Sequence, residues 1–145
     1  MNFNFGKTDE REITGRDEFR FLNKNKKLPD IIIYGATMTG KSWALKQINS
    51  HGLNIQTSFM QFSKENIERN YKNILFINWY CSNEQHLENI NKRYKKEITN
   101  EKIERWFKDN LSRQKHADRL GFKRVNNVND LQLLIDKYSN IYKSH

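Results

Sequence analysis

The chain has 145 residues, 36% of them hydrophobic and 12% aromatic, which suits a single folded domain and excludes a disordered chain. Its one cysteine, Cys81, excludes an internal disulfide, and no apolar stretch approaches the ~20 residues that span a bilayer. No amino-terminal stretch reads as a signal peptide, so we expect a cytoplasmic protein without a membrane segment.

The formal net charge is +9, and it is unevenly distributed. Between Lys92 and Arg124 twelve Lys and Arg residues stand against five Asp and Glu residues, so this segment alone carries +7. A basic segment of this kind would meet nucleotide phosphates, or a nucleic-acid or protein partner. The alternative is a solvated face of helices without a partner.

Residues 1–29 mix charged residues with scattered aromatics, and no helical or strand period runs through them. We expect an amino-terminal extension here that packs its aromatic side chains on the main body. The remaining residues, 30–145, are expected to form one domain without internal repeats.

Strand and helix patterns alternate along residues 30–145. Short apolar or β-branched runs predict four strands, at Asp30–Tyr34, Leu53–Met60, Ile74–Trp79 and Phe122–Val125. Helical spacing and capping residues predict five helices, which begin at Lys41, Ser63, Ser82, Thr99 and Asp130. The first should run to about Ser50, before His51 and Gly52, and the last to about Tyr142. The alternation predicts an α/β fold with a short parallel sheet flanked by helices.

The most specific motif lies between the first strand and the first helix. The segment Gly35-Ala36-Thr37-Met38-Thr39-Gly40-Lys41-Ser42 matches the phosphate-binding P-loop pattern G-x-x-x-x-G-K-[ST]. Glycines let successive backbone N–H groups point into one concave nest, and the helix that follows adds its own free N–H groups. Lys41 would reach the terminal phosphates, and the Ser42 hydroxyl would bind Mg²⁺.

A P-loop hydrolase normally places an acidic residue at the end of a second strand to hold Mg²⁺. The strongest second strand in this sequence ends at Asn78, a neutral amide and a weaker partner for the ion. Either the chain is not an ordinary ATPase, or this strand is not the one that holds the metal.

The second half of the chain, from Ile74 to Tyr142, resembles guanylate kinase in the nucleoside monophosphate kinase family. The order of its segments carries the resemblance: Ile77-Asn78-Trp79-Tyr80-Cys81-Ser82, then Glu84, Leu87, Ile90 and Arg93, then residues 99–107, then Phe122-Lys123-Arg124-Val125-Asn126-Asn127 and Asp130-Leu131. The resemblance implies a three-layer P-loop fold that binds ATP with Mg²⁺. It also implies that Arg93 is a lid arginine on the ATP phosphates and that Asn126 lies beside the adenine ring.

The sequence departs from this family between the P-loop helix and the later strand. Only residues 51–73 fill an interval that is far longer in guanylate kinases, and no counterpart of the GMP-binding residues is found. Trp106 occupies a position that is usually arginine, with Arg105 beside it. The ATP half of the family pattern is therefore retained, and the acceptor half is missing.

Three functions are compatible with these patterns. The first is a shortened nucleotide kinase that transfers the γ-phosphoryl group of ATP, with Lys41, Arg93, Arg105 and Arg113 neutralising the transferred charge. The second is a kinase-derived binding module with little or no catalysis. The third is a P-loop NTPase that acts on nucleic acid through the basic segment, although a guanine-specificity motif and an acidic strand end are both missing.

Overall fold

The computed structural model describes residues 28–60, 62–94 and 96–143. Within these residues four strands form one sheet: β1 (Ile31–Tyr34), β2 (Ile55–Ser58), β3 (Leu75–Trp79) and β4 (Lys123–Val125). All neighbouring pairs are parallel, and the strand order is β2-β1-β3-β4. The strand that leads into the P-loop sequence, β1, therefore lies in the interior of the sheet and is fully buried.

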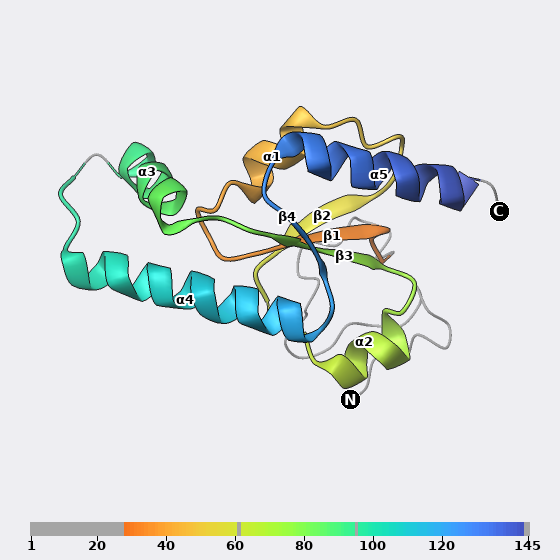
Figure 1. Cartoon of the computed structure of the whole chain (residues 1–145), viewed down its shortest axis with the longest axis horizontal. Coiled ribbons are helices and arrows are strands. Elements are labelled where there is room, and N and C mark those ends of the chain that lie inside the picture. Colours follow the sequence, from red (N-terminus) through yellow and green to blue (C-terminus); the bar gives the residue numbers. More distant parts are fainter. Residues whose placement is uncertain (1–27, 61, 95, 144–145) are drawn as a thin grey trace.

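Five helices flank the sheet in the described residues: α1 (Lys41–Gln47), α2 (Lys64–Asn70), α3 (Asn83–Arg93), α4 (Asn100–Arg119) and α5 (Val128–Lys143). Figure 1 shows α1 and α5 on one face of the sheet and α2 and α4 on the other. The predicted α/β fold with a short parallel sheet between helices is confirmed.

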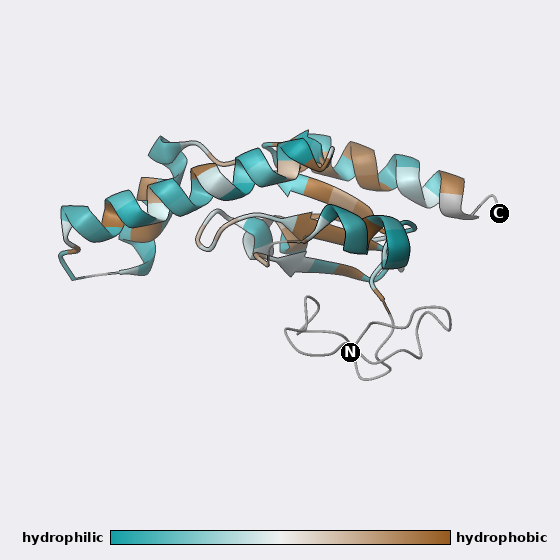
Figure 2. Cartoon of the chain, turned by 90° about the horizontal axis from the view of Figure 1, so that it is seen from below, coloured by the Kyte–Doolittle hydropathy of each residue, from teal (hydrophilic) through white to brown (hydrophobic). Residues whose placement is uncertain are grey.

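Alternate residues of the strands supply the two halves of the core, because successive side chains of a strand point to opposite faces. Ile31, Ile33 and Ile77 pack with Leu131 and Ile135 of α5 on one face. On the other face aromatic rings dominate, and they include Tyr34, Phe62, Phe76 and Phe122. Figure 2 shows hydrophobic residues along the strands and α5, whereas α2 and α4 are mainly hydrophilic.

The predicted caps of three helices are confirmed. The side chains of Ser63, Ser82 and Thr99 each accept a hydrogen bond from the backbone N–H three residues later. Such caps satisfy one of the free N–H groups at a helix start. The helix starts could be predicted because each cap is a local interaction.

Two predicted helix boundaries were wrong. Helix α1 ends at Gln47 rather than about Ser50, because Ile48 is extended and the Asn49 N–H is bound by Gln132 Oε1 of α5 (2.7 Å). Helix α5 begins at Val128 rather than Asp130, because Asn127 is the residue that caps it: its Oδ1 accepts from the Asp130 N–H (2.7 Å).

Most of the predicted amino-terminal extension, residues 1–27, lies outside the described residues. Its last two residues belong to the body, since Pro29 is buried and Leu28 packs against the aromatic half of the core. In the part of the chain that the structure describes, no helix has the length and hydrophobicity that crossing a membrane requires.

Candidate phosphate-binding site

Residues 35–42, hereafter the phosphate loop, connect the end of β1 to the start of α1. Gly35 N–H donates to the Ser58 carbonyl (3.0 Å), which fixes the start of the loop against the end of β2. A Cβ atom at position 35 would lie 3.3 Å from the Trp79 carbonyl oxygen, so the close approach of the backbone to β3 favours glycine here. Gly40 has a φ of 94° and Met38 a φ of 61°, which turns the chain sharply before the helix.

The carbonyl groups of the phosphate loop are bound by side chains. Ala36 O accepts hydrogen bonds from Thr39 Oγ1 (2.7 Å) and from Lys41 Nζ, both within the loop. The next three carbonyls are bound from β3 and α3: Thr37 O by His86 Nε2 (3.1 Å), Met38 O by Asn89 Nδ2 (3.0 Å) and Thr39 O by Trp79 Nε1 (2.7 Å). Four successive carbonyls thus face the protein.

The Gly35 N–H is bound by the Ser58 carbonyl, but several other amide groups of the loop have no partner among the described residues. Among the described residues, no acceptor binds the backbone N–H of Thr37, Met38 or Gly40. Free N–H groups of a tight turn that leads into a helix form a concavity for anions. The loop therefore connects β1 to α1 with these N–H groups free, and residues far along the chain hold it in place.

Lys41 is buried, with 8% of its surface exposed. Burial, together with the smaller effect of the nearby Arg113 guanidinium, lowers the pKa of its ammonium group to about 8. Among the described residues the ammonium group makes one hydrogen bond, to the carbonyl of Ala36, a neutral acceptor. A phosphate group bound at the loop would give this ammonium group an anionic partner.

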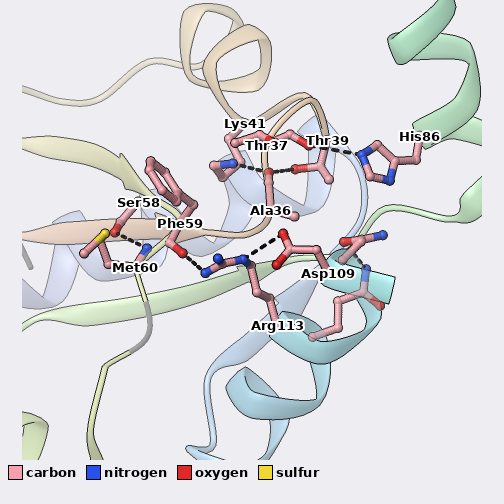
Figure 3. A network of polar contacts seen from close by, with 12 residues as sticks. Ala36, Thr37, Thr39, Lys41, Ser58, Phe59, Met60, His86, Asp109 and Arg113 are labelled. Carbon is pink, nitrogen blue, oxygen red and sulfur yellow. Dashed lines mark hydrogen bonds and ion pairs between the residues drawn. The ribbon is translucent and has the colours of Figure 1, made fainter. Parts of the chain in front are cut away.

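Helix α4 brings a second cation to the same side of the loop. Arg113 Nε donates to Asp109 Oδ2 (3.0 Å), and its Nη1 donates to the Phe59 carbonyl just after β2. Figure 3 shows the guanidinium between these two acceptors, and 18% of the Arg113 side chain is exposed. Asp109 is close enough to raise the pKa of Lys41, so it is the carboxylate that faces this site.

His86 is fully buried on α3 and lies beside the Phe107 ring. Its Nε2 must carry the proton, since it bonds to the Thr37 carbonyl, and Nδ1 has no partner among the described residues. Burial lowers the pKa of this imidazole. His86 is therefore a neutral donor that positions the loop.

On the other side of the loop a pocket of about 530 Å³ opens next to Thr39 and Gly40. Trp43 of α1, residues of α3 and the connection between β4 and α5 form its remaining walls, which include Asn89, Lys92, Asn126, Asn127 and Asn129. Its volume is within the ~300–1,000 Å³ typical of small-molecule sites. No carboxylate lines it in the part of the chain that is described.

The structure brings some of the predicted site residues together and leaves others apart. The loop and Asn126 border the same pocket, as the kinase resemblance implies. Arg93 and Arg105 are exposed, and no hydrogen bond or ion pair joins either to the loop among the described residues. Their assignment to the phosphates stays a prediction.

Asn78 does not face the phosphate loop. Its side chain is fully buried under α4, where Nδ2 donates to Asp118 Oδ1 (3.1 Å). The residue that ends β2 next to the loop is Ser58, so neither strand supplies a carboxylate there. Asp109, which sequence analysis did not single out, comes instead from the helix.

The residue expected to bind Mg²⁺ is Ser42. The Ser42 side chain is exposed at the start of α1, next to Lys41, and makes no hydrogen bond within the described residues. No group of three or more His, Cys, Asp or Glu side chains in this part of the chain could hold a metal ion. A hydroxyl of this kind fits an ion whose other ligands are phosphate oxygens and water.

The chain was compared with protein-family models, with curated proteins and with solved structures, and no match was found in any of the three. The resemblance to guanylate kinase therefore stays a prediction from the sequence. The architecture that positions the loop, an α/β fold with a four-stranded parallel sheet and helices on both faces, is a finding of the structure alone.

Proposed function

We propose that this protein binds ATP with Mg²⁺ on the phosphate loop, in a P-loop nucleotide-binding fold of the guanylate-kinase type. One observation carries the proposal. Four successive loop carbonyls are bound by side chains, while the free amide groups and Lys41 remain for an anion. Preorganised donors of this kind bind phosphates without a cost for ordering the loop.

The pocket beside Gly40 supports a nucleotide over an inorganic anion. A ligand whose phosphates lie on the loop would place its sugar and base in this space, beside Asn126. In the proposed complex the Ser42 hydroxyl contacts Mg²⁺, and Lys41 contacts the terminal phosphates. Bound Mg²⁺ would neutralise part of the phosphate charge.

Transfer of the γ-phosphoryl group is the activity that we assign to this site. Phosphoryl transfer depends mainly on positioning and on cations placed around the transferred oxygens. Lys41 and Arg113 lie on one side of the loop, and Asp109 orients the guanidinium. Arginine suits this task because its planar fork binds two oxygens at once.

A second candidate is a nucleotide-binding module without turnover. The observation that favours it is the lack of a carboxylate at the ends of β2 and β3, since β2 ends at Ser58 and β3 ends with Asn78 and Trp79. Without a strand-end carboxylate, Mg²⁺ would be held by one protein hydroxyl and the nucleotide itself. Binding would then be retained and catalysis weakened.

The test is incubation of the protein with labelled ATP, Mg²⁺ and a panel of nucleoside monophosphates. Transfer to one acceptor, lost in Lys41→Ala and retained in Lys46→Ala, is the expected result; Lys46 is an exposed lysine of the same helix. Binding of ATP without transfer would favour the module. Hydrolysis that rises with added DNA or RNA would favour an NTPase whose basic segment binds nucleic acid, and no binding of ATP at all would refute the proposal.

A further inference from the structure

Trp43 is a large aromatic residue that nothing in the described fold requires. It is the third residue of α1, directly after Lys41 and Ser42, and 59% of its surface is exposed. The next residue, Ala44, is the one that packs into the core. Among the described residues no ring stacks on Trp43 and no acceptor binds its indole N–H.

A single exposed aromatic residue is common on protein surfaces and proves nothing alone. Trp43, however, forms a wall of the pocket that begins at Thr39 and Gly40. An exposed indole in a concave site beside a phosphate loop offers a flat apolar face to a second flat group. Stacking of a base on an aromatic side chain is a favourable contact of this geometry.

Trp79, Lys92 and Val128 also line the pocket, and the other side chains around it, beyond Thr39 and Trp43, are neutral amides. Asn89 is fixed by its bonds to the Met38 carbonyl and to Gln85, and Asn127 by its bonds to Asp130 and Asn126. The Asn126 Nδ2 group has no partner among the described residues and remains free for a ligand. An amide can donate to N7 and accept from the N6 amino group of adenine at the same time.

We infer that Trp43 is the platform on which the base of the bound nucleotide stacks, and that Asn126 selects adenine. This inference rests on the proposed function, because it requires phosphates on the loop. It assigns to Trp43 a role that neither the P-loop motif nor the kinase resemblance includes. The pocket would thus bind the base by stacking on the Trp43 ring and by hydrogen bonds to the Asn126 amide.

The test is calorimetric titration of the full chain with Mg²⁺ and three ligands: ATP, GTP and inorganic tripolyphosphate. Trp43→Ala should weaken ATP binding by about fivefold to a hundredfold, as expected for one lost stacking contact, and leave tripolyphosphate binding unchanged. Trp43→Phe should retain most of the affinity for ATP. Leu133→Ala, which removes another exposed apolar side chain (66% exposed) on α5, is the matched control and should change nothing.

The outcomes separate this inference from the proposed function. Equal binding of ATP by wild type and Trp43→Ala, or equal losses for ATP and tripolyphosphate, would overturn the stacking role and leave phosphate binding intact. Equal affinities for GTP and ATP would overturn the selection of adenine. Failure of the wild type to bind either ATP or tripolyphosphate would overturn both proposals. Quenching of tryptophan emission by ATP that is lost in Trp43→Phe would support stacking directly, because that variant keeps Trp79, which also lines the pocket, and Trp106.

Discussion

The two sides of the phosphate loop are built from opposite chemistry. On one side, α1, α3 and the start of α5 surround an open pocket mainly with indoles and neutral amides, and with Lys92 of α3. On the other side, α4 and the end of β2 hold Arg113 and Asp109 next to the buried Lys41. The first side can contact an uncharged part of a ligand, and the second can contact its charged groups. The loop connects the two sides, so substitutions on the first side should change the affinity for the nucleotide, and substitutions on the second should change phosphate binding and its dependence on pH.

The largest effect is expected from Lys41→Met, and its two readouts should have opposite signs. Loss of a charged hydrogen-bond donor should weaken tripolyphosphate binding by roughly a hundredfold. The free energy of unfolding of the ligand-free protein at pH 7 should rise by about 1–3 kcal/mol, because the folded state no longer holds a buried ammonium whose pKa is lowered to about 8.

Urea unfolding as a function of pH checks the second readout. The pKa of Lys41 is lower in the folded state than in the unfolded state, so the unfolded state binds more protons between about pH 8 and the ordinary lysine pKa of 10.5. Wild-type stability should therefore rise relative to Lys41→Met across this range. A difference in the free energy of unfolding that does not change with pH would show that the pKa of Lys41 is the same in the folded and unfolded states, and would contradict this prediction.

The pH dependence of binding is the next largest effect. Above about pH 8 the free protein holds Lys41 largely neutral, and phosphates favour the protonated form. Binding should then take up a proton, and the affinity for tripolyphosphate should fall by roughly tenfold per pH unit above that value. Calorimetry in buffers of different ionisation enthalpy measures the proton uptake directly. Lys41→Arg, which does not titrate in this range, should bind with an affinity independent of pH.

The sequence predicts the two sides of the loop unequally well. The loop, its strand and the helix caps follow from short patterns, and Asn126 was placed by the order of segments. The contacts of Trp79, His86, Asn89 and Asp109 with the site could not be predicted, because each depends on how a helix or strand 40 or more residues away packs against the loop. His86 is one of four histidines spread along the sequence, and no residue near it in the sequence indicates that it contacts the loop.

Trp79→Phe should have a smaller effect, a decrease in the free energy of unfolding. The substitution keeps an aromatic ring in the core but removes the N–H that binds the Thr39 carbonyl (2.7 Å). A buried carbonyl left without a donor costs about 1–3 kcal/mol in the free energy of unfolding. Trp106→Phe, at a half-buried ring that stacks on Tyr94, is the control and should cost less. Equal losses for the two variants would mean that the indole contributes packing alone.

The smallest effects separate two neighbouring cations at the end of α3. Lys92 lines the pocket, whereas Arg93, the residue that the kinase resemblance places on the phosphates, is exposed and does not line it. Lys92 is exposed and paired with Glu88 (3.2 Å), so Lys92→Ala should weaken ATP binding only about threefold, and less at high salt. Arg93→Ala should change the affinity by less than about twofold. The reverse order, with a large loss for Arg93→Ala in turnover and a small one for Lys92→Ala, would mean that α3 moves when nucleotide binds and that Arg93 acts as the lid arginine after all.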